Sequence, residues 1–94
     1  MKIEKEFVLR EVADEYVIIP VGKTALEFND LITTNEIGAA IWKMLGTEIT
    51  FEALVKGILD KYDVEEQVVR EDVSEFLYLL ADKGILKIEE EIHV

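Results

Sequence analysis

The chain has no cysteine, and its 94 residues include only one histidine, one serine and one proline. Without cysteine there can be no disulfide, thiol nucleophile or thiolate zinc site, and one histidine cannot complete a zinc ligand set. The only serine, Ser74, falls inside a predicted helix, whereas His93 lies next to the end of the sequence. A serine nucleophile with a histidine base is therefore not expected, and we predict a binding module, not an enzyme.

Long hydrophobic runs and clustered glycines are also missing. No apolar stretch approaches the roughly 20 residues needed to cross a bilayer, and the amino terminus has no signal-peptide pattern. The five glycines are dispersed singly, so no phosphate-binding loop is present. The acidic run Glu89–Glu91 is interpreted as a solvated segment and not as a cation site. We expect a cytoplasmic protein that needs no metal or cofactor.

Basic residues are few, with 10 lysines and arginines against 21 acidic residues and a formal net charge of -11. Such a charge repels nucleic-acid phosphates and anionic membranes. It would suit a basic peptide, although acidic surfaces more often serve solubility alone. The length and the hydrophobic fraction of 50% indicate one globular domain over residues 1–94.

The first third of the chain predicts a small antiparallel sheet. Phe7–Val12 and Glu15–Val21 are strand-like, and the two residues between them fit a tight hairpin. The alternation in Ala25–Phe28 and the β-branched Leu31–Thr34 extend the sheet. Both faces of the second run are apolar, so Val17, Ile19 and Val21 form either a core face or a surface for a partner.

Helical patterns dominate the rest of the chain. Asn35 is a favourable N-cap for a first helix ending near Leu45, and the small Gly38 and Ala39 allow a neighbour to approach its first turn closely. Thr50 caps a second helix ending near Tyr62. A capping box of Asp63 and Glu66 starts a third helix over about Val64–Lys83, and Gly84 ends it. A strand-like return over Ile85–Ile88 and a solvated tail over Glu89–Val94 follow. The predicted fold class is α+β, resembling a winged helix-turn-helix: a small N-terminal antiparallel sheet followed by three helices.

The third helix has an unusually wide apolar arc. Val69, Val73, Phe76 and Leu80 form its centre, Val68 and Leu79 extend one side, and Leu77 and Ala81 extend the other. Such a helix meets two surfaces, which are either both core or include a groove for a ligand. Its early exposed positions carry Glu65, Glu66, Glu71, Asp72 and Glu75 against a single Arg70. This sign of charge is wrong for a DNA-recognition helix.

Three segments together carry a resemblance to a known family. They read EFVLREVADEYVIIPVG, FNDLITTNEIGAAIWKML and KYDVEEQVVREDVSEFLYLLADKGIL, and span about Phe7 to Leu86. Taken together and in this order, the three segments resemble the PqqD family, which is named for the peptide chaperone of pyrroloquinoline quinone biosynthesis. One departure is the connection Gly22–Asp30, which is longer than in those chaperones and favours a cyclised or thioether-bridged peptide as the product.

The resemblance implies a domain that recognises the leader of a ribosomally made, post-translationally modified precursor peptide. The leader would add as a strand beside the third β-strand, in a cleft next to the third helix, and a modifying enzyme, often a radical S-adenosylmethionine enzyme, would receive it. Carried onto this sequence, the peptide-binding residues are Leu31, Ile32, Thr33, Thr34, Val69, Asp72, Val73 and Phe76. The chain would act as a monomer or weak homodimer.

Several alternatives remain open at this point. A related domain in lasso peptide systems would serve a leader peptidase in place of the radical enzyme. A winged-helix DNA-binding regulator, an interaction module or homodimer using Val17, Ile19 and Val21, and an enzyme acting alone are the other hypotheses.

Overall fold

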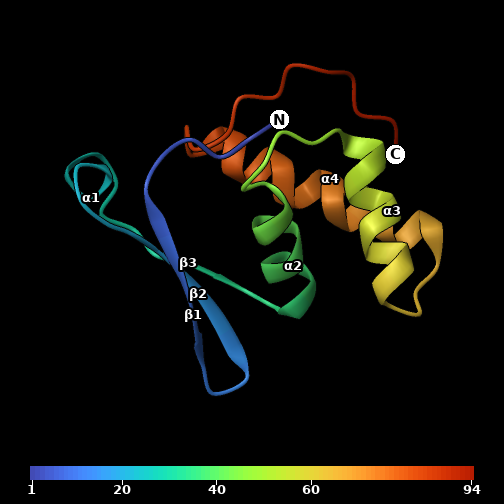
Figure 1. The fold of residues 1–94 in the computed structure, drawn as a ribbon, viewed down its shortest axis with the longest axis horizontal. Helices are drawn as coiled ribbons and strands as arrows, with labels where there is room; N and C mark the ends of the chain where they lie inside the picture. The colour runs from blue at the N-terminus through green and yellow to red at the C-terminus, as the bar shows by residue number, and fades with distance from the viewer. The chain divides into compact units, whose positions relative to one another are not determined.

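The computed structural model describes all 94 residues and has a three-stranded antiparallel sheet followed by helices, which confirms the predicted α+β class (Figure 1). The chain divides into two compact units, one formed by Lys5–Ala39 and the other by Met1–Glu4 with Ala40–Val94. The single domain over residues 1–94 stays a prediction.

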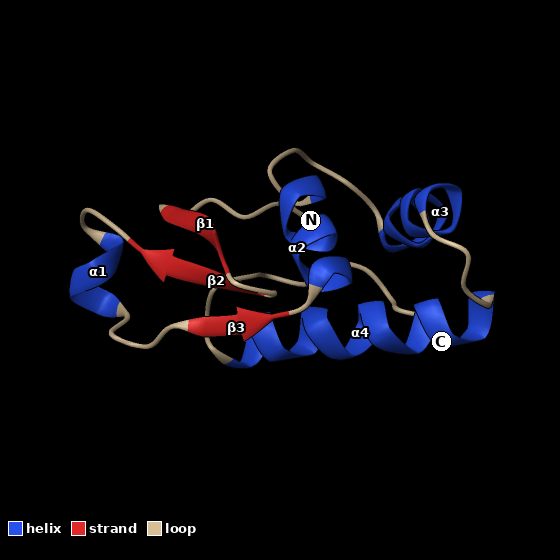
Figure 2. Cartoon of the chain, turned by 90° about the horizontal axis from the view of Figure 1, so that it is seen from below, coloured by secondary structure: helices blue, strands red, loops and turns tan.

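The unit Lys5–Ala39 contains the sheet, in the order β1 (Phe7–Val12), β2 (Glu15–Pro20) and β3 (Ile32–Thr34) (Figure 2). Val12 pairs with Glu15, so the connection is the two-residue hairpin that the sequence predicts, with Ala13 at φ 57°. Ile18 pairs with Ile32 and is completely buried. The Tyr16–Ile18–Pro20 face therefore contains the most deeply buried residue of this sheet.

The predicted strand over Ala25–Phe28 is wrong, because the structure forms the one-turn helix α1 (Thr24–Glu27) there. Local bonds hold this turn: the Phe28 N–H donates to Thr24 O over 2.9 Å. The Thr24 side chain is buried, and its Oγ1 accepts the Glu6 N–H over 2.9 Å. Four alternating residues are too few to distinguish a strand from a helical turn, and the bond to Glu6 favours the turn.

Three longer helices follow, as predicted: α2 (Glu36–Met44), α3 (Phe51–Lys61) and α4 (Glu66–Asp82). Both single-residue caps are confirmed, since Asn35 Oδ1 accepts the Gly38 N–H over 2.9 Å and Thr50 Oγ1 accepts the Ala53 N–H over 3.1 Å. The predicted capping box of Asp63 and Glu66 is wrong: the N-cap residue is Glu65, and it makes no side-chain cap bond.

Apolar faces of these helices supply the core of the second unit. The largest of its fully buried side chains are Ile41, Leu45, Phe51, Leu54, Ile58, Leu77 and Leu80. Their spacing follows the helical period that the sequence shows, so the amphipathic pattern correctly predicts which face of each helix is inside. No helix has the length and apolar character of a membrane span.

The segment after α4 differs from the prediction. Gly84 has φ 75°, and the N–H groups of Ile85 and Leu86 both turn back to Leu80 O, which ends the helix. Ile85 and Leu86 are buried, but no strand forms over Ile85–Ile88, so the predicted strand-like return is wrong. The burial of these two side chains accounts for their apolar character without a sheet.

The tail Glu89–Val94 is not simply solvated, which corrects a further prediction. The Phe51 N–H donates to Glu90 Oε1 over 3.0 Å, and Arg70 Nη1 donates to His93 O over 3.1 Å. Figure 1 shows the tail in red, crossing from the end of α4 to finish beside the start of α3. Glu90 and Ile92 are half-buried while Glu89 and Glu91 are exposed, so the tail is an extended segment with one inner side.

Candidate functional site

The first candidate feature is the free edge of β3. This strand pairs only with β2, so its other edge has no strand partner. In an antiparallel ladder, consecutive residues direct their backbone N–H and C=O groups to opposite edges of the strand. The groups on the free edge of β3 therefore belong either to Thr33 alone or to Ile32 and Thr34. An edge of this kind can accept an additional strand by backbone hydrogen bonding.

The side chains around this edge differ in accessibility. Ile32 is buried at 5% exposed, Thr34 is half-buried, and Thr33 and the preceding Leu31 are exposed, Leu31 at 59%. The structure therefore places three of the four predicted residues, Ile32–Thr34, on the edge strand, and Leu31 directly precedes it. Ile32 anchors the strand inward. Leu31 and Thr33 remain available to a partner.

The junction between β3 and α2 is tightly packed. A Cβ added at Gly38 would overlap Thr34 Oγ1 and would lie 3.0 Å from Thr34 Cβ. Together with the Asn35 cap, this contact fixes the direction in which the chain leaves the edge strand. It confirms the prediction that the small residues of the first turn permit a close approach.

The predicted residues of α4 lie within the other unit. Val69, Val73 and Phe76 are buried at 2%, 0% and 9% exposed, whereas Asp72 is exposed. The structure brings the three apolar residues together on the inner face of the helix. Of the four predicted residues of α4, only Asp72 has an exposed side chain that a ligand can contact.

Sequence periodicity did not reveal which apolar residues of α4 stay outside. Val68, Tyr78 and Leu79 are 44%, 51% and 42% exposed. The sequence places Val68 and Leu79 on one side of the apolar arc and Leu77 on the other, but it does not show that Leu77 is buried while Val68 and Leu79 stay exposed. Their exposure depends on which neighbours pack on the helix, and the pattern contains no such signal.

Arg70 is the basic residue nearest the start of α4, and it is fully engaged. Its Nη2 lies 2.6 Å from Glu52 Oε1 and its Nε lies 2.8 Å from Glu66 Oε2. The hydrogen bonds from Arg70 lower the pKa of Glu52, and the same carboxylates raise the pKa of Arg70. This guanidinium is therefore committed to α3 and α4 and is not free to bind phosphate.

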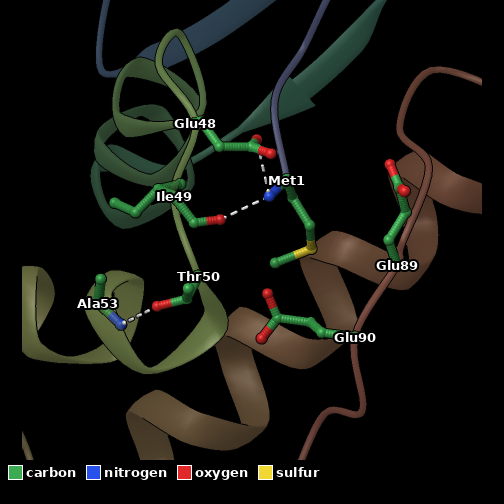
Figure 3. A pocket seen from close by; sticks show the side chains of 7 residues that line it. All are labelled: Met1, Glu48, Ile49, Thr50, Ala53, Glu89 and Glu90. Carbon is green, nitrogen blue, oxygen red and sulfur yellow. Dashed lines mark hydrogen bonds and ion pairs between the residues drawn. The ribbon is translucent and has the colours of Figure 1, made fainter.

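A cavity of about 460 Å³ lies in the unit formed by Met1–Glu4 and Ala40–Val94 (Figure 3). Its lining residues are Met1, Glu48, Ile49, Thr50, Ala53, Glu89 and Glu90. The Met1 ammonium group donates to Ile49 O over 2.6 Å and pairs with Glu48 over 3.0 Å. Most of the polar groups around this cavity thus bond to one another, and sequence analysis did not predict it.

The residues considered for chemistry do not form a catalytic or metal set. Ser74 Oγ donates to Glu71 O over 2.9 Å, and His93 lies 3.6 Å from Glu91. These two side chains therefore have different partners. No group of three or more histidine, aspartate or glutamate residues is arranged to hold a metal ion.

Comparison with protein-family models identifies the family of the chain. Residues 15–86 match the family model described as coenzyme PQQ synthesis protein D, PqqD. The chain belongs to the PqqD family. This assignment confirms the family resemblance seen in the sequence and includes β2, β3 and all three longer helices.

A solved structure supports the family assignment. The chain matches TbiB1, solved in complex with the TbiA(beta) leader peptide, with 26% sequence identity and a TM-score of 0.70. The match covers 97% of this chain and 100% of that one. No curated protein matches. This PqqD-family chain therefore has the fold of a protein that is known in a leader-bound form.

Proposed function

We propose that this PqqD-family protein is a non-catalytic chaperone for the leader of a ribosomally made precursor peptide. The leader pairs as an added strand with the free edge of β3. The observation that carries the proposal is this unpaired edge, in a chain whose relative TbiB1 is known in complex with a leader peptide. Backbone hydrogen bonds supply affinity in this mode of binding, and side chains supply selectivity.

The residues proposed for the site are those that the family resemblance implies. The residues that we propose at the strand edge are Leu31–Thr34. The leader-binding residues that we propose on α4 are Val69, Asp72, Val73 and Phe76. Leu31, Thr33 and Asp72 are accessible without rearrangement. The three buried residues of α4 would reach the leader only if their present packing opens.

The proposed role ends in delivery of the precursor to a modifying enzyme, which we take to be a radical S-adenosylmethionine enzyme. In a lasso peptide system a leader peptidase would receive the leader instead, and the bound precursor would be the same kind of molecule.

The experiment is affinity capture of peptides from a lysate of the organism that encodes the chain, read by intact-mass spectrometry. The tagged wild-type chain should retain a small unmodified peptide. The Thr33→Pro and Thr34→Pro variants should differ in their fold and in the peptide they retain, because consecutive residues point their backbone N–H groups to opposite edges of the strand. One proline removes an outward donor, and the other removes a bond to β2.

Circular dichroism separates the two effects. The variant that keeps the wild-type spectrum should lose the peptide, since only its outward donor is missing. Capture of no peptide by the wild-type chain would refute the function. Undiminished capture by the variant that keeps the wild-type spectrum would refute strand addition at β3 while leaving peptide binding in place.

A further inference from the structure

The outer face of α4 has a stripe of exposed residues that the core does not use. Val68, Asp72, Glu75 and Leu79 follow one another at intervals of four, three and four residues. They therefore fall within about 60° of the helix circumference. We call these four residues the α4 stripe. It shares only Asp72 with the site residues implied by the family resemblance.

The apolar ends of the α4 stripe are unusual for an outward helix face. Val68 and Leu79 are 44% and 42% exposed, and the neighbouring Tyr78 is 51% exposed. A helix that packs only on a core carries polar residues on its outer side. Large apolar side chains exposed on such a face are available to be covered by a partner.

The middle of the α4 stripe is negatively charged and uncompensated. Asp72 and Glu75 are exposed, and their carboxylates take part in no ion pair or side-chain hydrogen bond. Arg70, the nearest basic residue in the sequence, already bonds to Glu52 and Glu66. The stripe thus presents two free carboxylates between two apolar side chains.

We propose that the α4 stripe binds a segment of the leader that carries a lysine or arginine between two apolar residues. This inference rests on the proposed function, because it takes the leader as the occupant. Val68 and Leu79 are separated by eleven residues, or about 16 Å along the helix axis. An extended peptide spans that distance in about five residues, so the two apolar residues of the leader are about five positions apart.

Charge distinguishes this occupant from two others. A second copy of the chain would bring another net charge of -11 toward the same carboxylates, and duplex DNA would bring phosphates. Both are repelled by Asp72 and Glu75. A basic peptide is attracted, and its apolar residues can cover Val68 and Leu79.

The test is selection of short random peptides, about twelve residues long, on the immobilised full chain. Peptides selected by the wild type should be enriched in a lysine or arginine between two apolar positions. The Asp72→Asn/Glu75→Gln double variant keeps both side-chain sizes and should lose that enrichment. A selected basic peptide should bind this variant about fivefold more weakly, and its lysine-to-glutamine version should bind both proteins equally.

Two matched controls isolate the stripe. The Glu11→Gln/Glu15→Gln variant changes the net charge by the same amount on the β1–β2 hairpin and should keep the enrichment. Val68→Ser should weaken binding of the selected peptides, whereas Val12→Ser, at a valine that is also exposed, should not.

The possible failures are distinguishable. If Asp72→Asn/Glu75→Gln retains the basic enrichment, or if the hairpin control loses it, the stripe is not the determinant and the inference is overturned. If peptides without basic residues are selected and the proline variant of β3 abolishes their binding, strand addition survives and the charge assignment fails. Selection of no peptide would overturn this inference, whereas the proposed function is refuted only if the wild-type chain also captures no peptide from the lysate.

Discussion

At the scale of single residues, Gly38 is the most constrained position next to the β3 edge. A side chain there would meet not only Thr34 Oγ1 but also Thr34 Cβ at 3.0 Å and Cγ2 at 3.1 Å. Rotation of the Thr34 side chain cannot relieve all three contacts, because two branches leave the same Cβ. The glycine is therefore required by packing at the junction of β3 and α2.

We expect Gly38→Ala to lower the free energy of unfolding by about 1–3 kcal/mol, since overpacking forces the junction to move. An exposed helical site without this contact would instead gain about 1 kcal/mol from alanine. Urea denaturation of Gly38→Ala, Thr34→Ala and the double variant measures the effect. The double variant should recover part of the loss, because Thr34→Ala removes Oγ1 and Cγ2 but keeps Cβ. Additive losses would show that these two atoms are not the cause.

Ala13 is the second position where backbone geometry predicts a substitution effect. Its φ of 57° places an L-residue with a Cβ in the left-handed region, which is unfavourable by about 1–2 kcal/mol. Asparagine tolerates this conformation, so Ala13→Asn should raise the free energy of unfolding by about 0.5–1 kcal/mol. Ala13→Val should lower it, and changes of the same sign in both variants would contradict the geometry.

At the scale of elements, the ionic contacts of Arg70 join α3 to α4. Hydrogen bonds from Arg70 lower the pKa of Glu52 below its ordinary value of 4.5. The carboxylate is then more readily ionised in the folded chain than in the unfolded one. Its contribution to stability is present above the unfolded pKa and is lost as the pH falls through the folded pKa.

Thermal unfolding of wild type and Glu52→Gln at several pH values tests this linkage. The wild type should have the higher melting temperature above about pH 5, and the difference should shrink at lower pH as Glu52 becomes protonated in both states. Glu65→Gln, at an exposed glutamate without an ion pair, serves as the control. A difference that stays constant down to acid pH would exclude Glu52 ionisation as its source.

The tail acts as an added cap for α3. Thr50 bonds to the Ala53 N–H, and Glu90 accepts the Phe51 N–H over 3.0 Å, so two of the free donors of this helix start are satisfied. Glu90→Ala should lower the free energy of unfolding by about 0.5–1.5 kcal/mol. Glu89→Ala, one residue earlier, should change it little. Equal effects of the two variants in urea denaturation would mean that the bond adds no stability.

At the scale of the whole molecule, charge decides between peptide and nucleic acid as partners. The net charge is -11, and the guanidinium of Arg70 is occupied by Glu52 and Glu66. We expect no retardation of duplex DNA in gel shifts, even at about 50 mM salt, where phosphate contacts are strongest. Retardation that weakens steeply as salt rises would restore the DNA-binding hypothesis.

The sequence by itself determined the parts of the molecule that depend on near neighbours. The caps at Asn35 and Thr50 and the two-residue turn at Ala13-Asp14 act over two to four positions, so residue type and spacing are sufficient to predict them. The same holds for the inner faces of α2, α3 and α4, because their apolar residues repeat with the helical period. The family resemblance follows from the order of these local segments.

Tertiary structure decided what depends on residues far apart in the chain. Thr24 holds α1 through the Glu6 N–H, 18 positions away, and Glu90 caps α3 across 39 positions. The same reason applies to α4, where packing decides which side of the apolar arc is covered: Leu77 is buried, while Val68 on the other side remains exposed. A local pattern records which residues are apolar, but only the packed neighbours determine which of them are left for a partner.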